Sequence, residues 1–161
     1  SVHEYPTSEQ MAEIAISAAR VVRLFGFDPK VAFVSHSTFG QPLTSRTKHI
    51  KDAVEILRKK KVNFEFDGDM QPDVALDKEY KNLYPFSKIV GNANILVMPG
   101  QHSAAISYKM MKTLSDAKVI GPLLIGLGLP IEIAPLRSST SEILNLASIA
   151  AYSADVIDYK K

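Results

Sequence analysis

Near the start of the chain, apolar residues recur at a spacing of three to four positions and predict a long amphipathic helix. The residues that share its apolar face are Met11, Ile14, Ala15, Ala18, Val21, Val22 and Phe25. Thr7 and Gln10 have the spacing of a capping box, and Gly26 stands where a left-handed residue commonly follows a helix. We therefore expect this helix to begin just after Thr7 and to end just before Gly26.

Short apolar runs elsewhere in the chain predict strands. Residues 31–34 form a continuous apolar run, which is typical of a strand covered on both faces. Residues 62–66 alternate between apolar and polar, and the segment Asp67-Gly68-Asp69 is expected to close that strand. Two further buried strands are expected at residues 95–98 and 131–134.

Helical periodicity returns between these strands. A second helix is expected to end in the cationic run 58–61, which suits the negative end of a helix dipole. A short helix over 73–81, another over 104–114 and a last one opened by the Ser139–Glu142 capping box follow. The positions expected to face inward are Ile50, Ala53, Val54, Leu57, Ala104, Tyr108, Met111, Ile143, Leu146, Ala147 and Ala150.

This alternation of helices and strands predicts the fold class. It favours an α/β domain with a mostly parallel sheet flanked by helices and joined by right-handed crossovers. The chain of 161 residues has the length of one domain, and we expect residues 1–161 to be one domain excised from a longer protein.

Composition narrows the possible functions. The absence of Cys excludes disulfides, thiolate metal sites and a cysteine nucleophile, and the net charge of +2 gives no nucleic-acid footprint. The four His residues have no carboxylate or Cys at ligand spacing, so no metal site is expected. The longest apolar stretch is interrupted by Gly and Pro, so no membrane partner is expected, and a cytoplasmic location fits the cysteine-free chain.

Four polar loops are expected at the carboxyl ends of the strands: residues 35–42, 67–72, 99–103 and 135–139. In a parallel sheet such loops share one edge, where ligands bind, so the four loops should converge. The first loop carries Ser37, Thr38, Phe39 and Gly40. Its hydroxyls and backbone N–H groups suit a phosphate, with Arg46 as a nearby cation, or they simply cap the next helix.

The last loop offers a similar pair of interpretations. Arg137, Ser138, Ser139 and Thr140 bring a cation and three hydroxyls to a helix N-terminus. This combination is an anion site, or it is an ordinary capping box beside a surface arginine.

Several segments together resemble the phosphate acetyl- and butyryltransferases. Residues 67–73 read D-G-D-M-Q-P-D, similar to the family's D-G-E-[LM]-Q-x-D, and residues 35–40 match its S-x-S-T-x-G. Residues 85–96 look like P-x-S-x-x-x-G-x-A-N-[VI]-[LF], and I-L-N-L-A at 143–147 matches a helix of the family. The resemblance covers the C-terminal half of such a transferase. It implies that this chain has the sheet of that half, which is similar to the sheet of isocitrate and isopropylmalate dehydrogenases.

The departures from that family pattern are equally informative. By this resemblance, Pro135 and Leu136 stand at the two positions where the active transferases have a Ser-Arg pair. Glu142 aligns with an acidic residue that these transferases have one turn later. Transfer of an acyl group from phosphate to a thiol needs a fixed cation and a base, which Pro and Leu do not supply. Phe39 replaces a frequent Lys, and Ala105 replaces a frequent Asn.

This altered pattern resembles the C-terminal domain of the large bacterial hybrid malic enzymes. The resemblance implies a domain without catalytic residues that binds acetyl-CoA, inhibits the malic-enzyme domain of the same chain and mediates homo-oligomerisation. No cofactor is expected in this domain, whereas NAD(P) and a divalent metal are expected in the oxidoreductase domain outside it. The implied acetyl-CoA ligands are Ser37, Thr38, Phe39, Gly40, Arg46, Pro135, Leu136, Arg137, Ser138 and Ser139.

Two other functions remain open on the sequence alone. The chain is an active phosphate acetyl- or butyryltransferase if Arg137, one residue from the expected position, replaces the missing arginine. Alternatively, it is a purely structural dimerisation domain whose loops bind no ligand.

Overall fold

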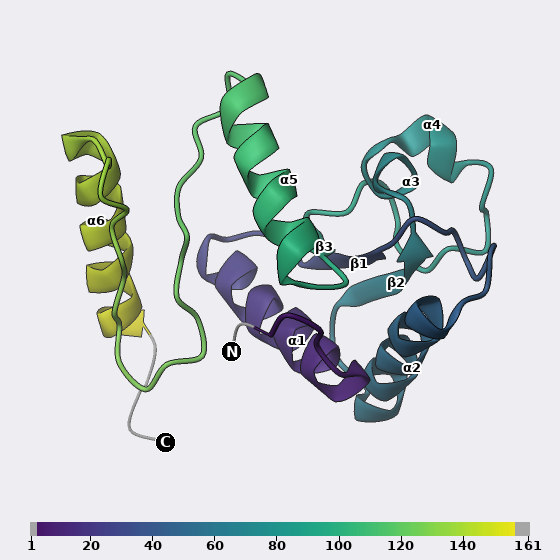
Figure 1. Ribbon diagram of the computed structural model, residues 1–161. Helices are drawn as coiled ribbons and strands as arrows, with labels where there is room; N and C mark the ends of the chain where they lie inside the picture. Colours follow the sequence, from purple (N-terminus) through teal and green to yellow (C-terminus); the bar gives the residue numbers. More distant parts are fainter. Residues whose placement is uncertain (1–2, 157–161) are drawn as a thin grey trace. The chain divides into compact units, whose positions relative to one another are not determined.

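The computed structural model describes residues 3–156, with the side chains of Arg46 and Lys81 left undescribed. The chain divides into two compact units that meet in the sequence between Ser107 and Tyr108. The first unit contains the β-sheet and the second contains the last helix (Figure 1).

The first unit is built on three parallel strands in the order β2-β1-β3 (Figure 1). The elements of the described chain, in order, are α1 (Ser8–Leu24), β1 (Lys30–Val34), α2 (Ser45–Lys60), β2 (Glu65–Met70), α3 (Pro72–Leu76), α4 (Lys78–Lys81), β3 (Ile95–Val97), α5 (Gln101–Leu114) and α6 (Thr140–Val156). The predicted α/β class with a parallel sheet is confirmed.

The ends of α1 follow the local signals in the sequence. The hydroxyl of Thr7 accepts a hydrogen bond from the N–H of Gln10 at 3.3 Å, and the Gln10 side chain accepts one from the N–H of Thr7 at 2.9 Å. Gly26 has a φ of +82°, so the chain leaves the helix through the left-handed conformation that glycine adopts without strain. The predicted capping box and glycine stop are both confirmed.

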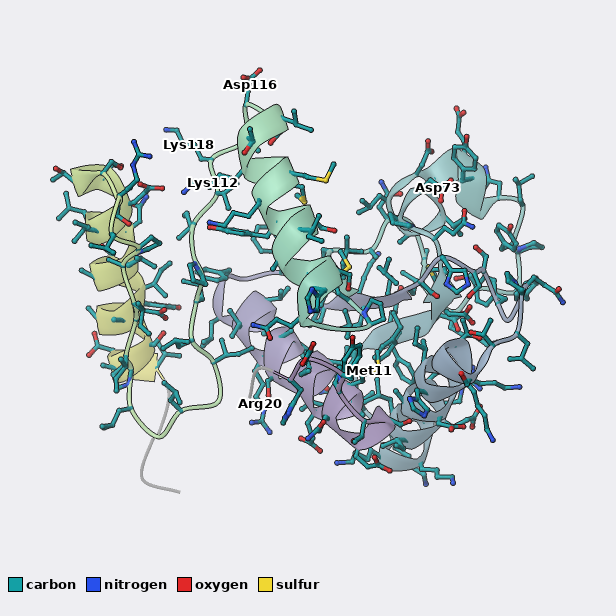
Figure 2. The ribbon with its side chains drawn as sticks, in the orientation of Figure 1. Met11, Arg20, Asp73, Lys112, Asp116 and Lys118 are labelled. Carbon is teal, nitrogen blue, oxygen red and sulfur yellow. The ribbon has the colours of Figure 1, made fainter. Side chains whose placement is uncertain are left out.

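Two apolar clusters cover the two faces of the sheet. On one face, Val31 and Phe33 of β1 and Val97 of β3 pack with the buried sides of α1 and α2. On the other face, Ala32 packs with Met70 and α3. This two-sided cover explains why β1 reads as an unbroken apolar run, because alternate residues of a strand point to opposite faces. Met11 of α1, labelled in Figure 2, belongs to the first cluster and is 1% exposed.

The second strand differs from the prediction. It runs from Glu65 to Met70, so residues 67–69 lie inside β2 rather than closing it. Asp67 and Asp69 are buried, and Gly68 pairs in register with Phe33 of β1. Their local sequence has the pattern of a loop, because a buried carboxylate requires partners that lie elsewhere in the chain.

The helix predicted over 73–81 is two short helices, α3 and α4. Asp77 separates them with an extended backbone, φ −112° and ψ 120°, and accepts a hydrogen bond from the N–H of Glu79 at 2.8 Å. An aspartate that caps a new helix in this way ends the preceding one.

The strand predicted at 131–134 is wrong. Across residues 115–139 the described chain contains no strand. The apolar pattern of 131–134 is that of a strand, but a strand exists only where a neighbouring strand pairs with its backbone. The described residues of the second unit supply no such neighbour.

The predicted inward faces of the last two helices are also largely wrong. Ala104 and Met111 of α5 are exposed and Tyr108 is half-buried, while on α6 only Leu146 of the four predicted positions is buried. By contrast, all four predicted positions of α2 are buried. The periodicity marks an apolar helix face correctly, but the described chain does not cover that face on α5 and α6. No helix among residues 3–156 is both long and apolar enough to cross a membrane.

Candidate functional site

The loop that follows β1 is held in place by a carboxylate of β2. The buried hydroxyl of Ser37 donates to Oδ2 of Asp69, and the N–H of Gly40 donates to Oδ1 of Asp69 at 3.0 Å. The N–H of Phe39 donates to the backbone oxygen of Asp69 at 2.6 Å. Asp69 therefore organises the loop, a role that sequence reasoning missed because its partners lie about 30 residues away.

The side chains of Ser37 and Thr38 in this loop are buried within the first unit. Ser37 is fully buried, with its Oγ 3.2 Å from the Oγ of Ser35. Thr38 is also buried, and its Oγ1 accepts a hydrogen bond from the N–H of Gln71 at 3.3 Å. Neither caps α2, because the N-cap is Thr44. The alternative in which these hydroxyls cap the helix is therefore wrong.

Phe39 and Gly40 line a cavity, whereas Ser37 and Thr38 do not. Phe39 has a φ of +50°, a left-handed conformation that bulky side chains rarely adopt and that often marks a functional loop. Its ring packs against those of Tyr84, at 5.5 Å between centroids, and Phe86, at 4.8 Å. This geometry leaves Phe86 59% exposed as an aromatic surface at the cavity.

We call this cavity the basic cavity; it has a volume of about 470 Å³. Besides the loop residues it is lined by the cations Lys51 and Arg58 of α2 and Lys88, and by the carboxylates of Glu55, Asp67 and Asp69. Arg58 is paired with Glu55, and the backbone N–H of Lys88 donates to Oδ2 of Asp67 at 2.7 Å. The ammonium groups of Lys51 and Lys88 form no ion pair within the described chain, so the cavity can receive an anion beside an aromatic ring.

A larger cavity of about 690 Å³ is also lined by residues of this loop. It is lined by residues that directly follow β1 (Ser35, His36) and β3 (Met98, Pro99), which are adjacent strands. Because the chain crosses from β1 in one direction to β2 and then in the other to β3, this gap is the topological switch point of the sheet. We call it the switch-point cavity.

Three of the four histidines meet at the switch-point cavity. His36 follows β1, His49 lies in α2 and His102 lies in α5, and all three are exposed side chains that line it. Their spacing in the sequence gave no sign of this, because only the sheet topology brings the three segments together. Among the described residues, no group of three or more His, Cys, Asp or Glu is arranged to hold a metal ion.

The predicted convergence of four loops is confirmed for three of them. The segments after β1, β2 and β3 leave the same edge of one parallel sheet. The loop 135–139 belongs to the second unit and follows no strand in the described chain. Arg46 lies in the first turn of α2, and its side chain is outside the described part of the structure.

In the second unit, residues 135–139 form a turn before α6. Pro135, Leu136 and Arg137 are exposed, and the N–H of Ser138 donates to the backbone oxygen of Pro135 at 2.9 Å. The N–H of Ser139 donates to Oε2 of Glu142 at 2.7 Å, and the N–H of Glu142 donates to the Ser139 hydroxyl at 3.2 Å. The predicted capping box at the start of α6 is confirmed.

Glu142 is the strongly perturbed carboxyl of this segment. The Nζ of Lys112, labelled in Figure 2, donates to its Oε1 at 2.8 Å, and Ser139 donates to its Oε2. These donors stabilise the carboxylate, the Lys112 ammonium most, and lower the pKa of Glu142 from 4.5 to about 2.

The start of α6 is therefore expected to weaken in acid. The pKa of Glu142 is lower in the folded protein than in the unfolded chain. The stabilisation of the fold by this carboxylate is therefore complete above about pH 4.5 and is lost as the pH falls toward about 2. An NMR titration of the Glu142 carboxyl checks this, and Lys112→Met should move the midpoint upward toward the ordinary value. A midpoint near 4.5 in the unaltered protein would contradict the prediction.

Comparison with known proteins agrees with this architecture. Residues 1–151 match the family model described as phosphate acetyl/butaryl transferase. The chain is 47% identical over 154 residues to an NADP-dependent malic enzyme of Rhizobium meliloti, covering 96% of this chain but 20% of that enzyme. It is 37% identical to a phosphate acetyltransferase of Clostridium acetobutylicum, covering 96% of this chain and 47% of that enzyme.

Solved structures show the same relationship. A phosphotransacetylase from Streptococcus pyogenes superposes with a TM-score of 0.90 at 33% identity, over 96% of this chain and 47% of that one. The chain thus spans about half the length of the phosphotransacetylases and about a fifth of the malic enzymes that it matches. In sequence and in fold, it belongs to the phosphate acetyl/butaryl transferase family, in the form that also occurs as a phosphotransacetylase-like domain within malic enzymes.

Proposed function

We propose that this chain is a non-catalytic, acetyl-CoA-binding regulatory domain of an NAD(P)-dependent malic enzyme. The observation that carries the proposal is the basic cavity, in which Phe39 and Gly40 meet Lys51 and Lys88. Coenzyme A carries phosphate groups and a planar adenine, which such cations and the exposed ring of Phe86 suit. The high identity to malic enzymes supports a longer protein in which this domain responds to a metabolite.

The absence of catalysis in this proposal rests on the turn before α6. Pro135 and Leu136 carry no charge and no proton-transfer group, and both are exposed. Affinity for coenzyme A comes from phosphate and apolar contacts, whereas the rate of acyl transfer depends on groups that act on the transition state. A site can therefore lose the groups that accelerate acyl transfer and still keep its affinity for coenzyme A.

Regulation requires that acetyl-CoA bind one arrangement of the longer protein more tightly than another. In the proposal the favoured arrangement is the inhibited one, the assembly is a homo-oligomer and the protein is cytoplasmic. The exposed apolar side chains of the second unit, Leu136 and Leu144 among them, support an interface that buries them. The nicotinamide cofactor and a divalent metal would be held by the malic-enzyme domain outside this chain.

The first test is calorimetry of acetyl-CoA with the full-length protein. Lys51→Ala or Lys88→Ala is expected to weaken binding about tenfold, or about 1.4 kcal/mol, because each removes a cation next to a phosphate. Lys59→Ala is the matched control, since Lys59 is exposed on the same helix α2 and does not line the cavity.

The outcome separates the competing functions. Inhibition of malate oxidation by acetyl-CoA that shifts in the Lys51 and Lys88 variants supports the proposal. No binding of acetyl-CoA to a folded protein would refute it. An inhibition curve unchanged by Arg46→Ala, Arg137→Ala, Lys51→Ala and Lys88→Ala would favour a purely structural dimerisation domain.

A second candidate, an active phosphate acetyltransferase, is favoured by the 37% identity to the clostridial enzyme. Arg137 would then supply the missing cation, because it is exposed and forms no ion pair among the described residues. Thioester formation from acetyl phosphate and coenzyme A, abolished by Arg137→Ala, would establish this activity in place of the regulatory one.

A further inference from the structure

The switch-point cavity is not used by the proposed acetyl-CoA site. The basic cavity lies beside α2 and β2, whereas the switch-point cavity opens between the ends of β1 and β3. No residue lines both of them among those that the structure describes. In parallel sheets the switch point is the place where ligands bind, so a second ligand is to be sought there.

The interior of this cavity is apolar. Its floor includes Met11, Val34 and Ile50, all buried side chains, with Met98 half-buried beside them. None of the described residues that line it is Lys or Arg. The described lining of the cavity offers no Lys or Arg to pair with a polyphosphate. An aliphatic chain bound there would remove its own apolar surface and that of the cavity from water.

The rim of the cavity is different in chemistry. It carries the imidazoles of His36, His49 and His102, whose ring N–H groups can donate hydrogen bonds to an anion. The other titratable groups that line the cavity are Glu4 and Tyr5. Glu9, in the first turn of α1, has its pKa lowered chiefly by backbone and Thr7 hydrogen bonds, with a small contribution from His49. An apolar floor beneath an imidazole rim is complementary to a molecule with a hydrocarbon tail and one anionic head.

The protein itself places a carboxylate at this rim. Oε1 of Glu4 lies 3.2 Å from Nε2 of His102, and the N–H of Gln101 donates to the backbone oxygen of Glu4 at 3.3 Å. Gly100 allows this approach, because a Cβ there would lie 2.6 Å from the same oxygen. The two side chains are 60% and 74% exposed, so the pair is solvated, weak and open to exchange.

We infer that the switch-point cavity binds a short- to medium-chain monocarboxylate, whose tail occupies the apolar floor and whose carboxylate replaces that of Glu4 at His102. The Glu4–His102 contact shows that the rim accepts a carboxylate at hydrogen-bond distance. The site is separate from the acetyl-CoA site and does not depend on it.

The proposal predicts that binding depends on the carboxylate of the ligand. Binding should weaken below about pH 4–5, where this carboxylate is protonated. A neutral ligand of the same shape should not show this loss.

The test is calorimetry of the full-length protein with octanoate and with octanamide, its neutral analogue. At about pH 6 we expect octanoate to bind at least about fivefold more tightly than octanamide, because a carboxylate accepts stronger hydrogen bonds than a neutral amide. His102→Ala should remove the preference for octanoate. Glu4→Gln should tighten octanoate binding about twofold to fivefold, because it removes the competing carboxylate.

Matched variants control for unrelated effects. Glu13→Gln alters an exposed position on α1 outside the cavity and should leave octanoate binding unchanged. Lys51→Ala should weaken acetyl-CoA binding without changing octanoate binding, so failure of one site is distinguishable from failure of the other.

Three results would overturn the inference. The first is no octanoate binding at millimolar concentration, and the second is equal affinity for octanoate and octanamide at about pH 6. The third is full displacement of octanoate by acetyl-CoA at one-to-one stoichiometry, which would make the cavity part of the acetyl-CoA site. Octanoate binding that depends on His102 and persists with acetyl-CoA bound would establish the separate site.

Discussion

Val97→Asp is expected to unfold the first unit. Val97 is the last residue of β3 and pairs with Phe33 of β1; it is 3% exposed and packs in the cluster formed with α1 and α2. The substitution forfeits about 1.5–3 kcal/mol of apolar burial and places an unpaired carboxylate where the described cluster contains only apolar side chains. The sum, at least about 5 kcal/mol, is comparable to the whole stability of a domain.

Two variants separate the charge from the change of shape. Val90→Asp introduces the same charge at a side chain that is 71% exposed, and it should shift the melting temperature by only a few degrees. Val97→Thr keeps the volume and should cost about 1–3 kcal/mol. Circular dichroism and calorimetry measure all three. A Val97→Asp protein that melts within a few degrees of the unaltered one would contradict the assignment of 95–97 as a buried strand.

Elements whose signals are local were predictable from the sequence. The ends of α1 are fixed by Thr7, Gln10 and Gly26, which act within three or four residues of where they stand. The buried face of α2 and the unbroken apolar run of β1 are likewise patterns within one element. For such features, periodicity and capping chemistry are sufficient.

Features that depend on distant partners were not predictable. Asp69 has the local pattern of a loop residue, yet its two carboxylate oxygens accept hydrogen bonds from Ser37 and Gly40, which lie in the loop after the neighbouring strand β1. Residues 131–134 have the composition of a strand, but the described chain gives them no partner to pair with. In both cases the local pattern is ambiguous, and the contact that resolves it is remote in the sequence.

The candidate sites show the same division. The sequence pointed to the loop after β1, and two of its residues, Phe39 and Gly40, do line a cavity. It did not reveal that Ser37 is used internally or that His36, His49 and His102 share one rim. Parallel topology implies which loops meet, whereas the direction in which each side chain points requires the structure.

Gly68→Ala is the second substitution with a large expected effect. Gly68 has a φ of +154° and pairs with Phe33 of β1. A Cβ at this position would lie 2.7 Å from the Cβ of Phe33 and 2.8 Å from its backbone oxygen. Phe33 is fully buried, so the clash falls on atoms that cannot move aside without breaking the strand pairing. Overpacking and the strained φ together should cost about 3 kcal/mol or more.

Two other glycines distinguish the clash from the strain of the backbone. Gly26→Ala meets nothing within 4 Å but keeps a φ of +82°, so it should cost only about 1–2 kcal/mol. Gly128→Ala meets nothing within 4 Å and has no positive φ, so it should change stability by less than about 0.5 kcal/mol. Chemical denaturation of the three variants ranks them, and a Gly68→Ala protein no less stable than Gly26→Ala would refute the close approach of β2 to β1. Because Gly68 stands between Asp67 and Asp69, the same variant should also disturb the loop of Gly40 and weaken acetyl-CoA binding at the basic cavity.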